Sequence, residues 1–172
     1  MCAARDPLNS DAVTVWYAVR IEDRQLCSGA SFSRLVSHAT SFVPATAVRV
    51  TELEIVPSVP VEMQPVNDVP PILPIETLYN AIGTIVQLVW GRFFFFRDEI
   101  AVSLAAREIA AKQESLLDDI ALSDFTICAF DNTEFVLFTR SLQFASALLS
   151  QDCPIEITKG TLASILHRQG EL

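Results

Sequence analysis

The sequence has few glycines and histidines and little basic charge, and each shortage excludes a class of function. None of its five glycines falls in a G-x-G-x-x-G or Walker pattern, so no glycine-rich turn is expected to cradle a phosphate. The two histidines, His38 and His167, have neither the spacing nor the neighbouring cysteines of a zinc site. The net charge of −9 repels nucleic acids and anionic membranes. We therefore expect no cofactor, no metal and no nucleic-acid partner.

Paired cysteines, glycosylation sites and long apolar runs are also missing. The four cysteines form no C-x-x-C pair; they are Cys2, Cys27, Cys128 and Cys153. No N-x-S/T sequon occurs, and residues 1–11 lack the apolar region of a secretory signal. The most apolar window, 80–96, contains Arg92, whereas a spanning helix needs roughly 20 largely apolar residues. These absences predict a cytoplasmic protein without a membrane span.

What the chain does have is the composition of a folded domain. Half of its 172 residues are apolar and only 19% are charged, which is enough apolar surface to build a core. Residues 57–74 contain six prolines, so this segment can be neither a helix nor a central strand. Its many apolar side chains predict a strap that packs between an N-terminal half, 1–56, and a C-terminal half, 75–172, of one domain. A boundary between two small domains is the alternative.

In the N-terminal half, apolar periodicity predicts two strands, a short helix and a third strand. They cover residues 12–22, 25–31, about 32–39 and 46–56. Val50 and Leu53 cannot share a face in a regularly alternating strand, so a bulge is expected between them.

In the C-terminal half, a helix is predicted from Ile75, with an apolar stripe through Val89 and a stop at Gly91. Residues 124–140 predict a β-hairpin with its turn at 131–133. A helix, a short strand and a final helix follow, over 142–150, 155–158 and 161–167. Because hairpins dominate, we expect an α+β fold in which helices pack on a mainly antiparallel sheet.

The segment WGRFFFFRDE, residues 90–99, needs cover on both sides. Four consecutive phenylalanines place two rings on each face of a strand, and a helix would leave no polar side either. We expect a strand that turns at 97–99. Two structures remain possible for residues 99–104. They are either a strand over 100–104 that pairs as a hairpin partner or the start of one long helix from Asp98 to Leu122. In both cases a helix is expected from about residue 105.

One catalytic arrangement is compatible with the residues present. Cys27 precedes a predicted helix, whose N-terminus would lower a thiol pKa, and His38 or His167 would serve as the base. The adjacent carboxylates of 98–99 and 118–119 point about 100° apart on a helix, which does not suit proton sharing. No EF-hand spacing is present. A small cysteine-dependent hydrolase is therefore the alternative function.

Acidic side chains concentrate in residues 98–134, which carry nine acids against two basic residues. This concentration predicts a solvated helix face or an acidic patch for a basic partner. The patch would consist of Asp98, Glu99, Asp118, Asp119 and Asp124.

The leading hypothesis is a non-enzymatic interaction module, such as an adaptor, a chaperone-like protein, an immunity protein or an assembly subunit. Strands that are apolar on both faces exceed what a small domain is expected to hide, so they predict contact with another protein or a second copy. The expected interface consists of Trp90, Phe93, Phe94, Phe95, Phe96, Phe135 and Phe138.

Overall fold

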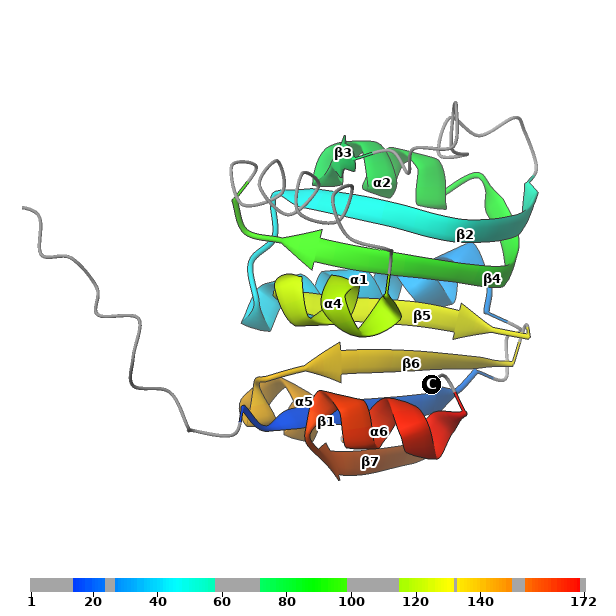
Figure 1. The fold of residues 1–172 in the computed structure, drawn as a ribbon. Coiled ribbons are helices and arrows are strands. Elements are labelled where there is room, and N and C mark those ends of the chain that lie inside the picture. The colour runs from blue at the N-terminus through cyan, green and yellow to red at the C-terminus, as the bar shows by residue number, and fades with distance from the viewer. Residues whose placement is uncertain are drawn as a thin grey trace, which may run out of the picture.

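A computed structural model describes six stretches of the chain, namely 14–23, 27–57, 72–98, 115–131, 133–149 and 154–170. Their helices and strands follow one another along the chain as shown in Figure 1. The elements are β1 (Trp16–Glu22), α1 (Gly29–Phe42), β2 (Ala47–Pro57), β3 (Ile72–Pro74), α2 (Ile75–Ile82), β4 (Ile85–Phe96), α4 (Leu116–Leu122), β5 (Phe125–Phe130), β6 (Glu134–Thr139), α5 (Leu142–Leu148), β7 (Ile155–Gly160) and α6 (Leu162–Gln169).

The seven strands form one antiparallel sheet in the order β3-β2-β4-β5-β6-β1-β7. The first of the described strands, β1, lies inside the sheet between β6 and β7. The long strand β4 pairs with β2 on one side and with β5 on the other. The predicted α+β fold with a mainly antiparallel sheet is confirmed.

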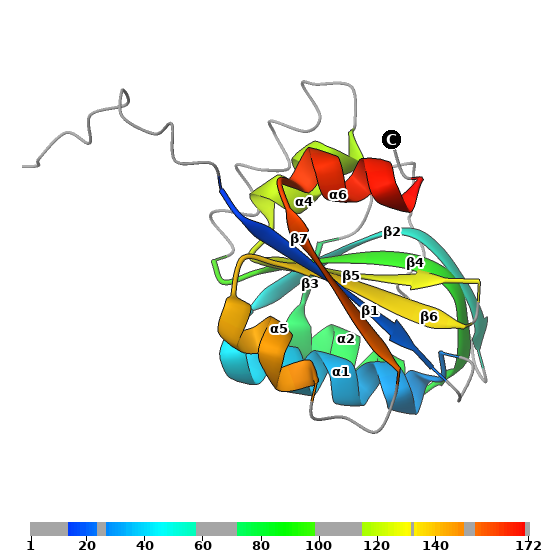
Figure 2. The same ribbon diagram turned by 90° about the horizontal axis from the view of Figure 1, so that it is seen from below.

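Helices cover both faces of the sheet, as Figure 2 shows. We call the face covered by α1, α2 and α5 the first face, and the face covered by α4 and α6 the second face. Each face carries its own apolar cluster. Side-chain alternation along β4 sends Phe93 and Phe95 into the first cluster and Phe94 and Phe96 into the second.

The phenylalanine run is therefore a central strand, as predicted, and both of its sides are covered. All four rings are at most 2% exposed. On the first face, the Phe93 ring lies 4.4 Å from the Phe32 ring of α1, and Phe95 stacks on Phe125 at 4.4 Å. Such ring pairs stabilise a core beyond the burial of their area.

The predicted bulge in the third strand of the N-terminal half is confirmed. The register between β2 and β4 shifts between Thr51 and Glu54, and Glu52 has a φ of 51°. The extra residue lets Val50 and Leu53 both face the first cluster, which strict alternation would prevent.

Four of the described helices begin after a hydroxyl cap, whereas α2 follows Pro74. Ser28, Ser115, Ser141 and Thr161 each accept a hydrogen bond from the backbone N–H three residues later. The hairpin over 124–140 and the elements over 142–150, 155–158 and 161–167 are confirmed as β5, β6, α5, β7 and α6.

Two sequence-based predictions were wrong. The strand expected over 25–31 is replaced by the start of α1, because Ser28 caps a helix that begins at Gly29. The helix expected from Ile75 to Val89 ends at Ile82, and a turn at 83–84 leads into β4. The β-branched residues beyond that turn favour a strand, and the Leu88 N–H donates to the Cys27 carbonyl.

Most of the proline-rich strap and residues 99–104 lie outside the described residues. The alternative of one helix from Asp98 to Leu122 is wrong, because Ser115 is extended and caps α4. At the end of the strap, β3 pairs with residues 47–49 of β2.

No helix in the described part of the chain is long and apolar enough to cross a bilayer.

Candidate functional site

Cys27, the candidate nucleophile, is enclosed. The thiol is fully buried and donates a hydrogen bond to the Glu134 carbonyl oxygen at 3.4 Å. Burial raises the pKa of Cys27 from 9.0 to about 12, and the carboxylates of Asp23 and Glu134 add to the rise. A nucleophilic cysteine needs a lowered pKa, so the environment of Cys27 works against the proposed chemistry.

Neither histidine lies beside this thiol. His38 sits nine residues beyond the start of α1, a separation of about 14 Å along the helix, and its ring lies 5.1 Å from the Phe42 ring. His167 is exposed on α6 of the second face, whereas Cys27 belongs to the first-face cluster. Among the described residues, no group of three or more His, Cys, Asp or Glu side chains is placed to hold a metal ion.

The phenylalanines expected at an interface are buried inside the chain's own core. Phe135 and Phe138 are as enclosed as the four rings of β4, at 2% and 1% exposure. The expectation assumed that a domain of this size leaves such side chains uncovered, but the helices on both faces enclose them. Of the expected interface residues, Trp90 alone is partly exposed.

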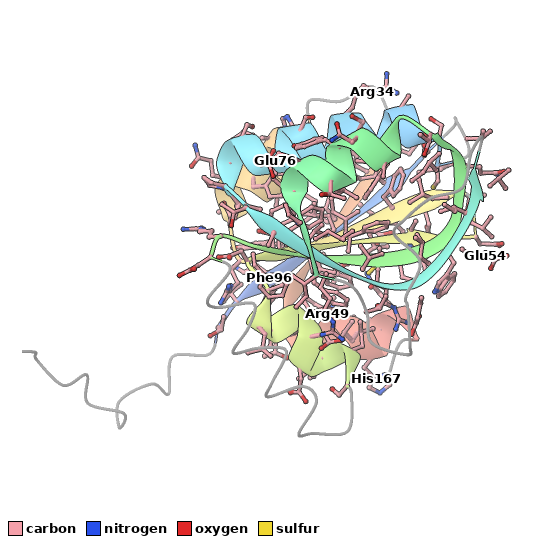
Figure 3. All side chains as sticks on the ribbon, turned by 90° about the horizontal axis from the view of Figure 1, so that it is seen from above. Arg34, Arg49, Glu54, Glu76, Phe96 and His167 are labelled. Carbon is pink, nitrogen blue, oxygen red and sulfur yellow. The ribbon has the colours of Figure 1, made fainter. Side chains whose placement is uncertain are left out.

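The described members of the predicted acidic patch are not all on the surface. Asp119 is buried in a two-pronged ion pair with Arg49, at 2.9 and 3.3 Å, and Figure 3 shows Arg49 between the sheet and α4. Asp124 pairs with Arg97 at 3.3 Å and also accepts the Arg97 backbone N–H. Asp98 is exposed and Asp118 is partly buried in the first turn of α4, while Glu99 lies outside the described residues.

A different surface combines aromatic and acidic side chains at one end of the second face. The strand register places Phe130 opposite Glu134 and Glu134 opposite Glu22, so these side chains cross three adjacent strands. We call the whole surface the acidic rim. It consists of Arg20, Glu22, Glu52, Glu54, Trp90, Arg92, Phe130, Glu134 and Glu156.

An aromatic pair forms the β4–β5 part of the acidic rim. Trp90 and Phe130 are both partly exposed and meet edge to face, with ring centroids 4.8 Å apart. The Trp90 indole N–H donates to Glu52 at 3.1 Å, and Arg92 donates to the other oxygen of Glu52 at 2.7 Å. The polar atom of the indole is therefore satisfied by the chain itself, and its apolar ring borders solvent.

Charge dominates the β6–β1–β7 part of the acidic rim. Arg20 binds Glu134 at 3.0 Å, and its neighbours Glu22 and Glu156 are exposed with no ion-pair partner among the described residues. These four side chains help to line an open hollow of about 410 Å³. With five glutamates and two arginines, the rim carries a net charge of −3.

The β2 edge completes the surface. Glu54 is the Cα partner of Trp90 across the β2–β4 pair, and Figure 3 shows it at the outer edge of the sheet, away from the labelled Arg49. The count of acidic residues over 98–134 did not predict this surface, because the rim draws its residues from six strands. The sequence did contain part of the evidence for the rim, because side-chain alternation along β1 places Arg20 on the same strand face as Trp16.

Comparison of the chain with protein-family models, with curated proteins and with solved structures found no match.

Proposed function

We propose that this protein is a non-enzymatic interaction module that binds another protein through the acidic rim. The observation that carries the proposal is the partly exposed Trp90–Phe130 pair, framed by glutamates, at the end of an otherwise covered sheet face. Aromatic side chains beside polar neighbours are typical of the residues that dominate binding energy at protein interfaces.

The environment of the candidate nucleophile supports the same proposal. A buried thiol with a raised pKa and no adjacent imidazole is suited to packing rather than to attack on a substrate. The thiols of Cys27 and Cys128 are buried and not in a disulfide, which also fits a reducing, cytoplasmic compartment. An adaptor, a chaperone-like protein, an immunity protein and an assembly subunit all belong to this class of function.

Self-association through the acidic rim is disfavoured by charge. Two copies would bring two surfaces of net charge −3 together, and opposed like charges cost binding energy. A partner of different composition is therefore the better occupant.

The experiment is capture from the native source with the full chain and with a Trp90→Ser variant. We expect a partner that co-elutes with the wild type at fixed stoichiometry and is lost with the variant. As a matched control, Leu142→Ser replaces an exposed apolar residue on α5 and should retain the partner. A strictly monomeric wild type without a stoichiometric partner contradicts the proposal, and so does esterase activity that disappears in Cys27→Ala.

A further inference from the structure

We infer that the segment that docks on the acidic rim is cationic and places one arginine or lysine side chain beside Trp90 and others beside the unpaired glutamates. This inference rests on the proposed function and names the chemistry of the partner.

First, two carboxylates lie side by side on the second face and support a cationic partner. Glu22 and Glu134 are direct cross-strand partners, an arrangement of like charges that destabilises a sheet. Arg20 offsets the charge of Glu134, but Glu22 has no such partner among the described residues. A cation brought by another chain would offset this remaining charge.

The hollow supplies a place for that cation. Glu22 and Glu156 line it together with Arg20 and Glu134, and Glu156 is the Cα partner of Arg20. Because Arg20 is already committed to Glu134, the carboxylate of Glu156 is available to an incoming guanidinium or ammonium group. Charge-assisted hydrogen bonds of this kind are stronger than neutral ones.

The second argument comes from the aromatic pair. The indole N–H of Trp90 is occupied by Glu52, so what the residue offers a partner is the partly exposed remainder of its ring. Tryptophan is the best side-chain acceptor for a cation placed over an aromatic face. The chain itself contains such a contact, since the exposed Arg140 lies 5.1 Å from the centre of the Trp16 ring.

The third argument is long-range charge. The chain carries a net charge of −9, which accelerates the approach of cationic partners and repels acidic ones. Aromatic, hydrogen-bonding and charged groups at the acidic rim thus favour the same kind of occupant.

The test uses the full chain and a fluorescein-labelled hexa-arginine peptide, with fluorescence anisotropy as the readout. The rim variant Glu22→Gln/Glu156→Gln removes two charges without breaking any ion pair of the described residues. The control variant Glu76→Gln/Asp118→Asn removes two charges from α2 and α4. We expect the rim variant to weaken binding about tenfold and the control less than about twofold.

Two further arms separate local recognition from general attraction. Trp90→Leu should weaken binding about fivefold at unchanged net charge, and hexa-glutamate should not bind. Equal weakening by the rim and control variants overturns the inference, because it would mean that only the overall charge matters. Absence of wild-type binding at about 50 mM salt, where surface charges are weakly screened, also overturns it.

The outcomes distinguish this inference from the proposed function. If hexa-arginine fails while a native partner is lost with Trp90→Ser, the interaction module stands and the cationic partner is rejected. If the native partner is also absent, both are rejected.

Discussion

The two faces of the sheet are covered in different ways. The first face carries a continuous cluster of aliphatic and aromatic side chains beneath α1, α2 and α5. The second face is covered by two short helices of seven and eight residues, and it includes the Arg49–Asp119 ion pair as well as apolar side chains. One face therefore supplies most of the apolar core, while the other combines packing with charge and ends in a partly exposed rim.

The largest expected change in stability compares a buried phenylalanine with a partly exposed one. It tests whether burial, and not aromatic character, decides how much each ring contributes to folding. Phe93→Ala should lower the free energy of unfolding by about 4 kcal/mol, because a fully buried ring leaves a cavity beside Phe32. Phe130→Ala at the acidic rim should cost about 1 kcal/mol, since its ring is already partly exposed. Urea unfolding of both variants measures the difference, and equal losses would remove the distinction between core and rim.

The second prediction concerns the buried charges of the second face. Asp119→Ala should cost about 3 kcal/mol, because it leaves the Arg49 guanidinium buried without its carboxylate. The double variant Arg49→Met/Asp119→Leu should recover most of that loss by replacing the pair with apolar side chains. Urea unfolding of the single and double variants provides the measurement. A double variant no more stable than the single one would show that the pair is not an isolated unit.

The third prediction probes how closely α1 of the first face approaches the α2–β4 turn. A Cβ added at Gly29 would overlap the backbone oxygens of Ile82 and Ile85, so Gly29→Ala should cost about 2 kcal/mol through overpacking. Gly83→Ala is the control, because its Cβ would meet only an ordinary contact at 3.8 Å. Thermal unfolding should separate the two, and similar melting temperatures would mean that the helix shifts freely.

The smallest expected effect uses the thiol of the first-face cluster as a pH probe. The pKa of Cys27 is raised from 9.0 to about 12, so the unfolded chain loses this proton at lower pH than the folded chain. Stability from this group is complete below about pH 9 and falls as the pH rises toward 12, by about 1 kcal/mol between pH 8 and 10. Cys27→Ala should lack this part of the decline, and parallel pH profiles for the two proteins would contradict the assignment.

Much of the fold was predictable because local chemistry determined it. The turn between β5 and β6, the Ser141 cap, and the spacing of Val50 and Leu53 each specify an element through neighbouring residues. The sequence pattern led to a wrong prediction where the apolar residues of a helix and of the following strand together fit one helical spacing. Ile82 and Ile85 fit a helical stripe, yet one ends α2 and the other begins β4.

The candidate site was less predictable because it depends on register between distant strands. Trp90, Phe130 and Glu22 lie far apart in the sequence and meet on one surface only once β4, β5, β6 and β1 are aligned. The burial of the phenylalanine run likewise depends on helices from both ends of the chain. Charge counts along the sequence cannot show that Asp119 is used by Arg49 inside the fold.

The most direct test of the account follows the two tryptophan indole N–H signals by NMR while hexa-arginine is added to the full chain. Trp16 lies within the second face at 4% exposure, whereas Trp90 lies at its partly exposed rim, and Trp90→Phe assigns the two signals. We predict that the Trp90 signal shifts progressively to saturation while the Trp16 signal stays fixed. A fixed Trp90 signal, or equal movement of both signals, would contradict the claim that the acidic rim is the binding surface.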